Sequence, residues 1–118
     1  MSMVIRDEQL NELTRVTRPA YVGRVLVFLE RRHPARMAEV GREEARLRIE
    51  TALNAAPDWG LVEGEDLTRY CELTFLFGVG FEHDSAYPWA AEIAHSGWSS
   101  PSELVTSWHV TGLALLDL

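Results

Sequence analysis

The longest apolar stretch of the chain lies near its middle, in the segment Glu65 to Phe81, EDLTRYCELTFLFGVGF. Apolar residues recur in this segment at steps of three and four, and further apolar residues fill the other faces after the first two turns. A helix that is apolar on all sides has to be buried. We therefore expect a buried central helix over about 65–81, enclosed by the rest of the chain.

The segments on either side carry apolar residues on one face only, which is typical of helices that pack around a core. Prolines and glycines mark where these helices start and end. Pro19 predicts a break or sharp bend, because proline disfavours helical geometry in the residue before it. The pattern predicts helices at 7–17, 19–32, 42–56 and from Pro101 onward, with shorter helices at 34–40 and from Pro88.

No segment alternates apolar and polar residues for long enough to predict a strand bounded by hairpin turns. We therefore expect an all-α fold, a compact bundle of about five longer and two short helices around the central helix. A chain of 118 residues has the size of one domain, so residues 1–118 are expected to form a single helical domain. The polar segments at 82–87 and 96–99 are expected to be surface loops.

Composition places the chain among folded, soluble proteins, since 47% of its residues are apolar and 25% are charged. The single cysteine, Cys71, lies in the most apolar segment and is expected to be a small buried side chain. The amino terminus does not have the pattern of a signal peptide, and no apolar run is long enough to span a membrane. We expect a cytoplasmic protein that does not bind membranes.

Charge is distributed unevenly along the chain. Residues 1–50 carry a net charge of +2 and residues 51–118 a net charge of −9, which gives −7 in total. Nucleic acids and anionic membranes attract basic proteins, because binding releases the counterions of the phosphates. This balance argues against nucleic acid as a partner and favours a basic protein surface as the partner of the acidic half.

One tripeptide, Glu82-His83-Asp84, offers three side chains that can bind metal ions. Adjacent loop residues rarely aim at one ion, and no second cluster completes a site. The other histidines stand apart in the sequence and are expected to be ordinary surface or half-buried residues; they are His33, His95 and His109. We therefore expect no metal site.

Covalent and acid–base chemistry also lack a convincing centre. A nucleophilic Cys71 would need a base and an electropositive pocket, but its neighbours are Tyr70, Glu72 and apolar residues. The paired carboxylates Glu65 and Asp66 have a structural purpose at the positive end of a helix. The sequence contains no phosphate-binding glycine loop or serine elbow. We expect neither catalytic residues nor a cofactor.

Four tryptophans are the one compositional feature that bears on binding. Trp89 and Trp98 flank a short helix beside loops, where large rings with a polar N–H often anchor interfaces. The alternative is that they cover the open end of the bundle. Leucines crowd the carboxy terminus on more than one face, so either the domain or a partner must cover them. The candidate partner-binding residues are Glu82, Asp84, Trp89, Trp98 and Trp108.

The order of several motifs resembles a known group of proteins. RIETALNAA is followed by a glycine stop at Gly60, the LTRYCELTFLFG helix, a polar link with Asp84, and YPWAAEI. RDEQL near the amino terminus and the Phe28 to Pro34 segment fit the same order. The chain resembles small helical proteins encoded beside effector genes of bacterial type VI secretion systems. Pro19 and the loop at 96–101 depart from that pattern.

The resemblance implies an accessory role in effector loading. The chain would act as a co-chaperone or adaptor that binds a secreted effector, the effector's chaperone or a spike-tip protein. An immunity protein that blocks a cognate toxin domain is the alternative, and a small enzyme is a third hypothesis. Homo-oligomers are also compatible with the sequence.

Overall fold

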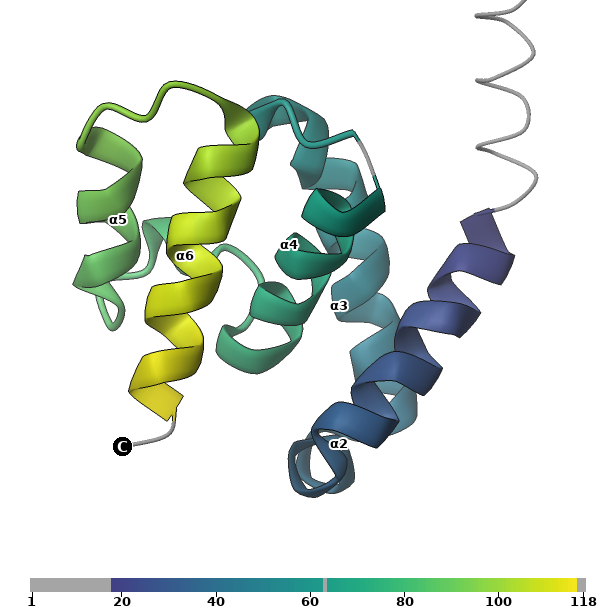
Figure 1. The fold of residues 1–118 in the computed structure, drawn as a ribbon. Helices are drawn as coiled ribbons and strands as arrows, with labels where there is room; N and C mark the ends of the chain where they lie inside the picture. Colours follow the sequence, from purple (N-terminus) through teal and green to yellow (C-terminus); the bar gives the residue numbers. More distant parts are fainter. Residues whose placement is uncertain (1–17, 63, 117–118) are drawn as a thin grey trace, which may run out of the picture.

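The computed structural model describes residues 18–62 and 64–116, and all regular secondary structure in these ranges is helical. Helix 18–32 is the first described element, and the predicted helix 7–17 and its junction with helix 18–32 lie outside the described residues. The elements that follow are α2 (Pro34–Val40), α3 (Arg42–Ala55), a 3-10 turn (Ala56–Trp59), α4 (Gly64–Phe77), a second 3-10 turn (Phe81–His83), α5 (Pro88–His95) and α6 (Pro101–Leu116). The predicted all-α fold is confirmed (Figure 1).

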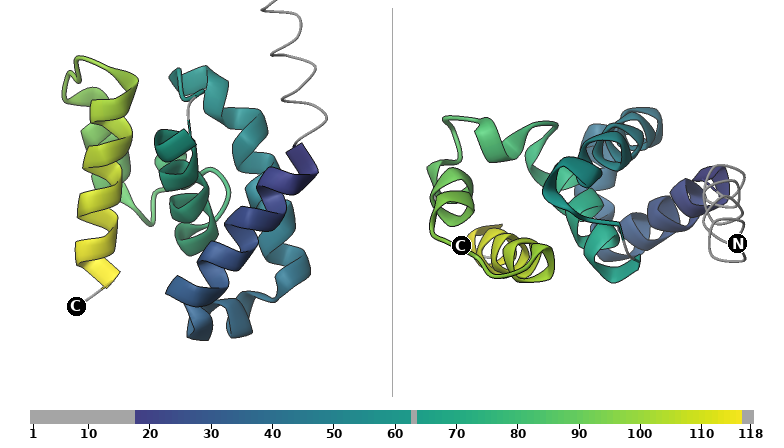
Figure 2. Two further views of the ribbon diagram at one scale, coloured as in Figure 1. Left: turned by 45° about the vertical axis from the view of Figure 1, so that its right-hand side comes forward. Right: turned by 90° about the horizontal axis from the view of Figure 1, so that it is seen from above.

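Helix α4 is the centre of the bundle. It packs against α3 on one side and α6 on the other, with α5 beside α6 (Figure 2). Seven consecutive residues of α4, 70–76, are buried. Helix 18–32 also contacts α4, since the Tyr21 hydroxyl lies 2.9 Å from the Thr68 hydroxyl. The prediction of an enclosed central helix is confirmed.

The central helix is shorter than predicted, because it ends at Phe77 and not at Phe81. Gly78 and Gly80 have φ angles of 102° and 75°, a left-handed conformation that glycine adopts without steric cost. The chain therefore leaves the helix at Gly78 and turns, and Phe81 is buried from within a 3-10 turn. The apolar spacing in the sequence extends beyond the end of α4, because the turn places Phe81 in the same core as the buried residues of α4.

Two arginines from other helices cap the carboxyl end of α4. Arg36 of α2 donates to the carbonyl of Leu76 at 2.9 Å, and Arg48 of α3 donates to the carbonyl of Phe75 at 2.8 Å. The last carbonyls of a helix lack intrahelical partners and carry partial negative charge, so cations stabilise them. These contacts fix the end of the central helix relative to α2 and α3.

The amphipathic helices turn their predicted apolar faces inward. In the predicted helix 42–56, helical spacing of the apolar residues predicts an inner face of five residues, and all of them are buried: Ala45, Ile49, Ala52, Leu53 and Ala56. On α6, helical spacing predicts an inner side formed by Leu104, Val105, Trp108, Gly112 and Leu115, and the first four of these are buried. Leu115, by contrast, is 42% exposed. The buried face of α6 therefore ends before the last turn.

Gly112 lies where α6 packs tightly against α4 and α5. A Cβ atom at this position would lie 2.9 Å from Phe77 Cε2, 3.1 Å from Leu73 Cδ2 and 3.2 Å from Trp89 Cη2. We expect Gly112→Ala to lower the free energy of unfolding by about 1–2 kcal/mol, since overpacking outweighs the gain in helix propensity. Urea denaturation measures this change.

Gly23→Ala is the matched control. Gly23 is also helical, but nothing lies within 4 Å of the position of its Cβ. This replacement is expected to raise the free energy of unfolding by about 0.5–1 kcal/mol through helix propensity alone. Equal effects of the two replacements would contradict the close packing at Gly112.

Candidate functional site

A buried glutamate, Glu72, occupies the middle of α4 with only 1% of its surface exposed. One carboxylate oxygen accepts from the Nε2 of His33 and the other from the Nε2 of His109, each at 2.6 Å. The Arg32 Nε lies 2.8 Å from the oxygen that His33 contacts. The two histidines stand far apart in the sequence, yet the fold brings both of them to one carboxylate. We call these four residues the Glu72 cluster.

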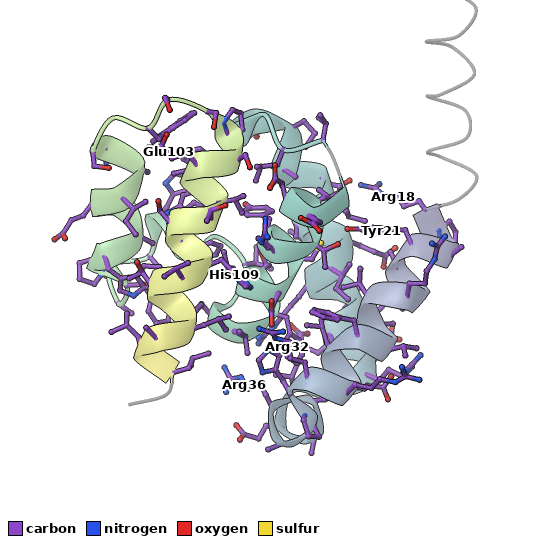
Figure 3. The ribbon with its side chains drawn as sticks, in the orientation of Figure 1. Arg18, Tyr21, Arg32, Arg36, Glu103 and His109 are labelled. Atoms are coloured by element: carbon purple, nitrogen blue, oxygen red, sulfur yellow. The ribbon has the colours of Figure 1, made fainter. Side chains whose placement is uncertain are left out.

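Three parts of the chain outside α4 contribute to the Glu72 cluster. Arg32 ends helix 18–32, His33 precedes α2, and His109 comes from α6 on the other side of α4. Figure 3 shows Arg32 and His109 approaching the region of α4 from opposite sides. The cluster therefore joins the first described helix and the last one through the central helix.

Charge in the Glu72 cluster favours an ionised carboxylate. Burial alone would raise the pKa of Glu72, but hydrogen bonds from His109 and His33 and the charges of His109 and Arg32 together outweigh it. The pKa of Glu72 is consequently lower than the ordinary value of 4.5. Both carboxylate oxygens are satisfied by protein donors. Because the protein itself satisfies Glu72, the cluster is suited to linking helices.

A second buried carboxylate, Glu82, corrects the expectation of a polar surface loop at 82–87. Glu82 is 5% exposed, and its Oε1 accepts from the Tyr70 hydroxyl at 2.9 Å. Its Oε2 is buried without a hydrogen-bond partner among the described residues. Burial and the neighbouring Glu82 both raise the pKa of the Tyr70 phenol, so Tyr70 remains a donor. The hydrogen bond to Tyr70 links the turn that contains Glu82 to α4.

The other two residues of the tripeptide point elsewhere. The His83 ring stacks on Trp59 with centroids 5.9 Å apart, and the Asp84 carboxylate accepts from the Ala86 amide at 2.9 Å. In the ranges 18–62 and 64–116, no group of three metal-binding side chains is placed to hold an ion. The tripeptide does not converge on one point.

Trp108 is a core residue and not a surface contact. It is fully buried, and its Nε1 donates to the carbonyl of Ala90 at 2.8 Å. Its ring makes edge-on contacts with Trp59 at 5.1 Å and with Phe81 at 5.4 Å between centroids. Trp108 and the buried Glu82 are therefore not presented to a partner in this structure.

The other candidate partner-binding residues remain accessible to different degrees. Trp89 is half-buried and packs edge-on against Phe77, with centroids 5.2 Å apart. Trp98 is also half-buried, and its Nε1 donates to the carbonyl of Ala94 at 2.9 Å. Asp84 is exposed. Both rings thus cover the core, and each keeps part of its surface open to solvent.

Cys71 has the properties of an inert thiol. It is fully buried, and burial raises the pKa of its thiol to about 12, although the charge of Arg18 acts in the opposite direction. A thiol must lose its proton to act as a nucleophile. Cys71 therefore serves as a core side chain, as the sequence predicted.

Helix α6 exposes apolar residues on its outer side, at Val110, and around its last turn, at Leu115 and Leu116. Val110 is 63% exposed, Leu115 42% and Leu116 48%. From Thr106 to Leu116 the helix carries no Asp, Glu, Arg or Lys. Helix α6 lies on the outside of the bundle (Figure 2), and no described element covers these three residues. We call the exposed residues of this segment the α6 face.

The α6 face and the buried Glu72 cluster are different kinds of feature. The α6 face presents apolar surface to solvent, which is suited to contact with another macromolecule. No described helix is both long and apolar enough to cross a bilayer.

Comparisons of the chain with protein-family models, curated proteins and solved structures found no match.

Proposed function

We propose that the chain is a non-enzymatic, protein-binding accessory of a bacterial type VI secretion effector module. It would act as a co-chaperone or adaptor for an effector or for the effector's chaperone. The observation that carries this proposal is the exposed, uncharged α6 face. The resemblance of the chain to small helical proteins encoded beside such effector genes supports an effector or its chaperone as the partner.

The chemistry of the α6 face agrees with this role. The centres of protein interfaces are depleted in charged residues and enriched in apolar ones. Val110, Leu115 and Leu116 leave apolar side chains in water, where burial against a partner would stabilise a complex. The leucines near the carboxy terminus that the sequence singled out thus contribute to a surface that the domain leaves open.

Co-expression with the effector encoded at the same locus tests the proposal. The tagged chain is expected to co-purify with the effector or its chaperone, and native mass measurement gives the stoichiometry. Deleting the gene is expected to lower the amount of soluble or secreted effector. If effector accumulation, secretion and complex formation are all independent of the chain, the proposal is wrong.

Charging the α6 face should weaken this complex. We expect Val110→Arg to raise the dissociation constant by about tenfold or more, because a charge would be desolvated without a partner. Binding to the purified effector complex, measured by calorimetry, provides the readout. Leu47→Arg is the matched control, because Leu47 is 48% exposed on α3. An equal loss in both variants, or no loss with Val110→Arg, would argue against the α6 face.

The acidic carboxy-terminal half favours a second candidate, an immunity protein that blocks a toxin active site. Residues 51–118 carry a net charge of −9, which would complement a basic toxin surface. An immunity protein would protect cells that produce the toxin domain and would form a one-to-one complex with that domain. A co-chaperone or adaptor would alter effector stability or loading without giving protection.

A further inference from the structure

Helix 18–32 has a second face that lies largely outside the core, although Phe28 packs partly against it. Its inner face buries Val22, Val25, Leu26 and Leu29. The residues at 24, 27, 28, 31 and 32 follow helical spacing on another side of the helix. We call them the arginine stripe; they are Arg24, Val27, Phe28, Arg31 and Arg32, and together they line a shallow concavity of about 370 Å³.

The composition of the arginine stripe is that of an interface. Val27 is 43% exposed and Phe28 is half-buried, so the centre of the stripe is apolar. Arginines lie at both ends of this apolar centre. Buried aromatic and arginine side chains contribute most of the binding energy in many protein complexes, and Arg is enriched at interfaces.

Arg32 is held in place at one end of the stripe. Its Nε lies 2.8 Å from the Glu72 carboxylate, and its guanidinium carbon lies 5.7 Å from the centroid of the Phe28 ring. Its side chain nevertheless remains 47% exposed. The Glu72 cluster therefore orients the guanidinium, and a ligand would lose less conformational entropy on binding it.

Arg24 and Arg31 differ from most arginines of the described chain. Within residues 18–62 and 64–116, neither forms an ion pair, whereas six other arginines pair with carboxylates: Arg32, Arg36, Arg42, Arg46, Arg48 and Arg69. The chain as a whole has an excess of acidic residues. Among the described residues, these two positive charges thus have no carboxylate partner, and they lie on the face that also exposes Val27.

We propose that the arginine stripe binds an acidic amphipathic helix of a partner protein. The stripe extends from Arg24 to Arg32, about 12 Å along its helix, which matches two to three turns of an opposing helix. Apolar side chains of that helix would cover Val27 and Phe28, and its carboxylates would pair with Arg24, Arg31 and Arg32. The inference deepens the proposed function, on which it rests for the existence of a protein partner.

A protein helix fits the stripe better than nucleic acid does. The apolar centre requires an apolar counterpart, which a phosphate backbone does not supply. The net charge of −7 also opposes binding to a polyanion over any larger area. A carboxylate-bearing helix with an apolar stripe satisfies both parts of the surface.

Two designed peptides provide the probe. The first is a helical peptide of about 18 residues, long enough to form a helix, with an apolar stripe flanked by glutamates. The second is identical except that lysines replace the glutamates. We expect fluorescence anisotropy with the full chain to show binding of the acidic peptide, weakened by added salt, and at least about tenfold weaker binding of the basic peptide.

Charge reversal identifies the surface that is used. Arg24→Glu/Arg31→Glu is expected to weaken binding of the acidic peptide by about tenfold or more, and Arg24→Gln/Arg31→Gln is expected to have a smaller effect of the same sign. Both positions are exposed, so circular dichroism should remain unchanged. Arg46→Glu on α3 is the matched control, because Arg46 is exposed to a similar degree as Arg32 but lies outside the stripe.

Several outcomes would overturn the inference. They are equal binding of both peptides, an equal effect of Arg46→Glu, and stronger stripe-dependent binding of a DNA duplex than of the acidic peptide. The effector complex separates this inference from the proposed function. If the complex forms normally with Arg24→Glu/Arg31→Glu and the acidic peptide does not bind, only the inference fails. If the peptide binds through the stripe and no effector complex forms, the proposed function fails.

Discussion

Replacing Trp108 by alanine is expected to lower the free energy of unfolding by about 3–5 kcal/mol. The ring is fully buried between Trp59 and Phe81, so its removal leaves a large cavity. The carbonyl of Ala90 would also lose the hydrogen bond from the indole. Urea denaturation followed by circular dichroism measures the loss.

Trp98→Ala is the control for Trp108→Ala. Trp98 is only half-buried, and its indole bonds a carbonyl within its own segment, Ala94. We expect this replacement to cost about 1–2 kcal/mol, because less apolar surface leaves the core. A stable Trp108→Ala variant that fails to bind the effector complex would instead restore Trp108 as a partner contact.

Replacing Glu72 by glutamine is expected to lower the free energy of unfolding by about 2–3 kcal/mol at neutral pH. The volume of the side chain is kept, but the negative charge that Arg32 and the two histidines face is lost. One atom of the amide would also place a donor against an imidazole donor. The decrease in unfolding free energy therefore measures the lost interactions of the Glu72 carboxylate and not the creation of a cavity.

The pH dependence of this loss follows from the lowered pKa of Glu72. A carboxyl group with a lower pKa in the folded state stabilises the fold fully above the ordinary value of 4.5, and this contribution disappears as pH falls through the folded pKa. The difference in unfolding free energy between wild type and Glu72→Gln should thus shrink as the pH falls below 4.5. Denaturation of both proteins across this range measures it.

Glu65→Gln serves as the control at the start of the same helix. The Glu65 side chain is 88% exposed and lies 3.7 Å from Arg69. Surface ion pairs contribute about 0–1 kcal/mol, so this replacement should have little effect at any pH. A difference between wild type and Glu72→Gln that does not change with pH would contradict an ionised Glu72.

The helices could be predicted from the sequence because each depends on local signals. Apolar spacing identified the inner faces of α3 and α6, and proline or glycine identified most ends. The end of α4 was placed too late because Phe81 is buried like a helical core residue. Its burial comes from a turn that depends on the left-handed conformation of Gly80, which periodicity does not report.

The Glu72 cluster was not predicted because its members lie far apart in the sequence. His33 and His109 are separated from Glu72 by 39 and 37 positions, so no local motif contains them. One signal was present, however. A glutamate among buried apolar residues requires charged or hydrogen-bonding partners, because burial of an unpaired charge is costly. The position of Glu72 could have indicated that cations from neighbouring helices converge there.

The candidate contact residues show a related effect. Trp108 falls on the same helical face as Leu104, Val105 and Gly112, so its spacing already placed it in the core. Assigning it also to a contact surface relied on the general role of tryptophan at interfaces. The exposed α6 face is instead formed by smaller aliphatic residues. Composition alone does not tell these exposed aliphatic residues from the leucines that are buried in the core.

The cross-chain bonds of Glu72 have a consequence for how the domain comes apart. Detaching helix 18–32 would strip Arg32 from the carboxylate, and detaching α6 would strip His109 from it. Either event exposes the Glu72 carboxylate to water and weakens the interaction of Glu72 with the helix that is still attached. Detachment of one of these helices therefore also destabilises the packing of the other. We expect helix 18–32, α4 and α6 to unfold together as one cooperative unit.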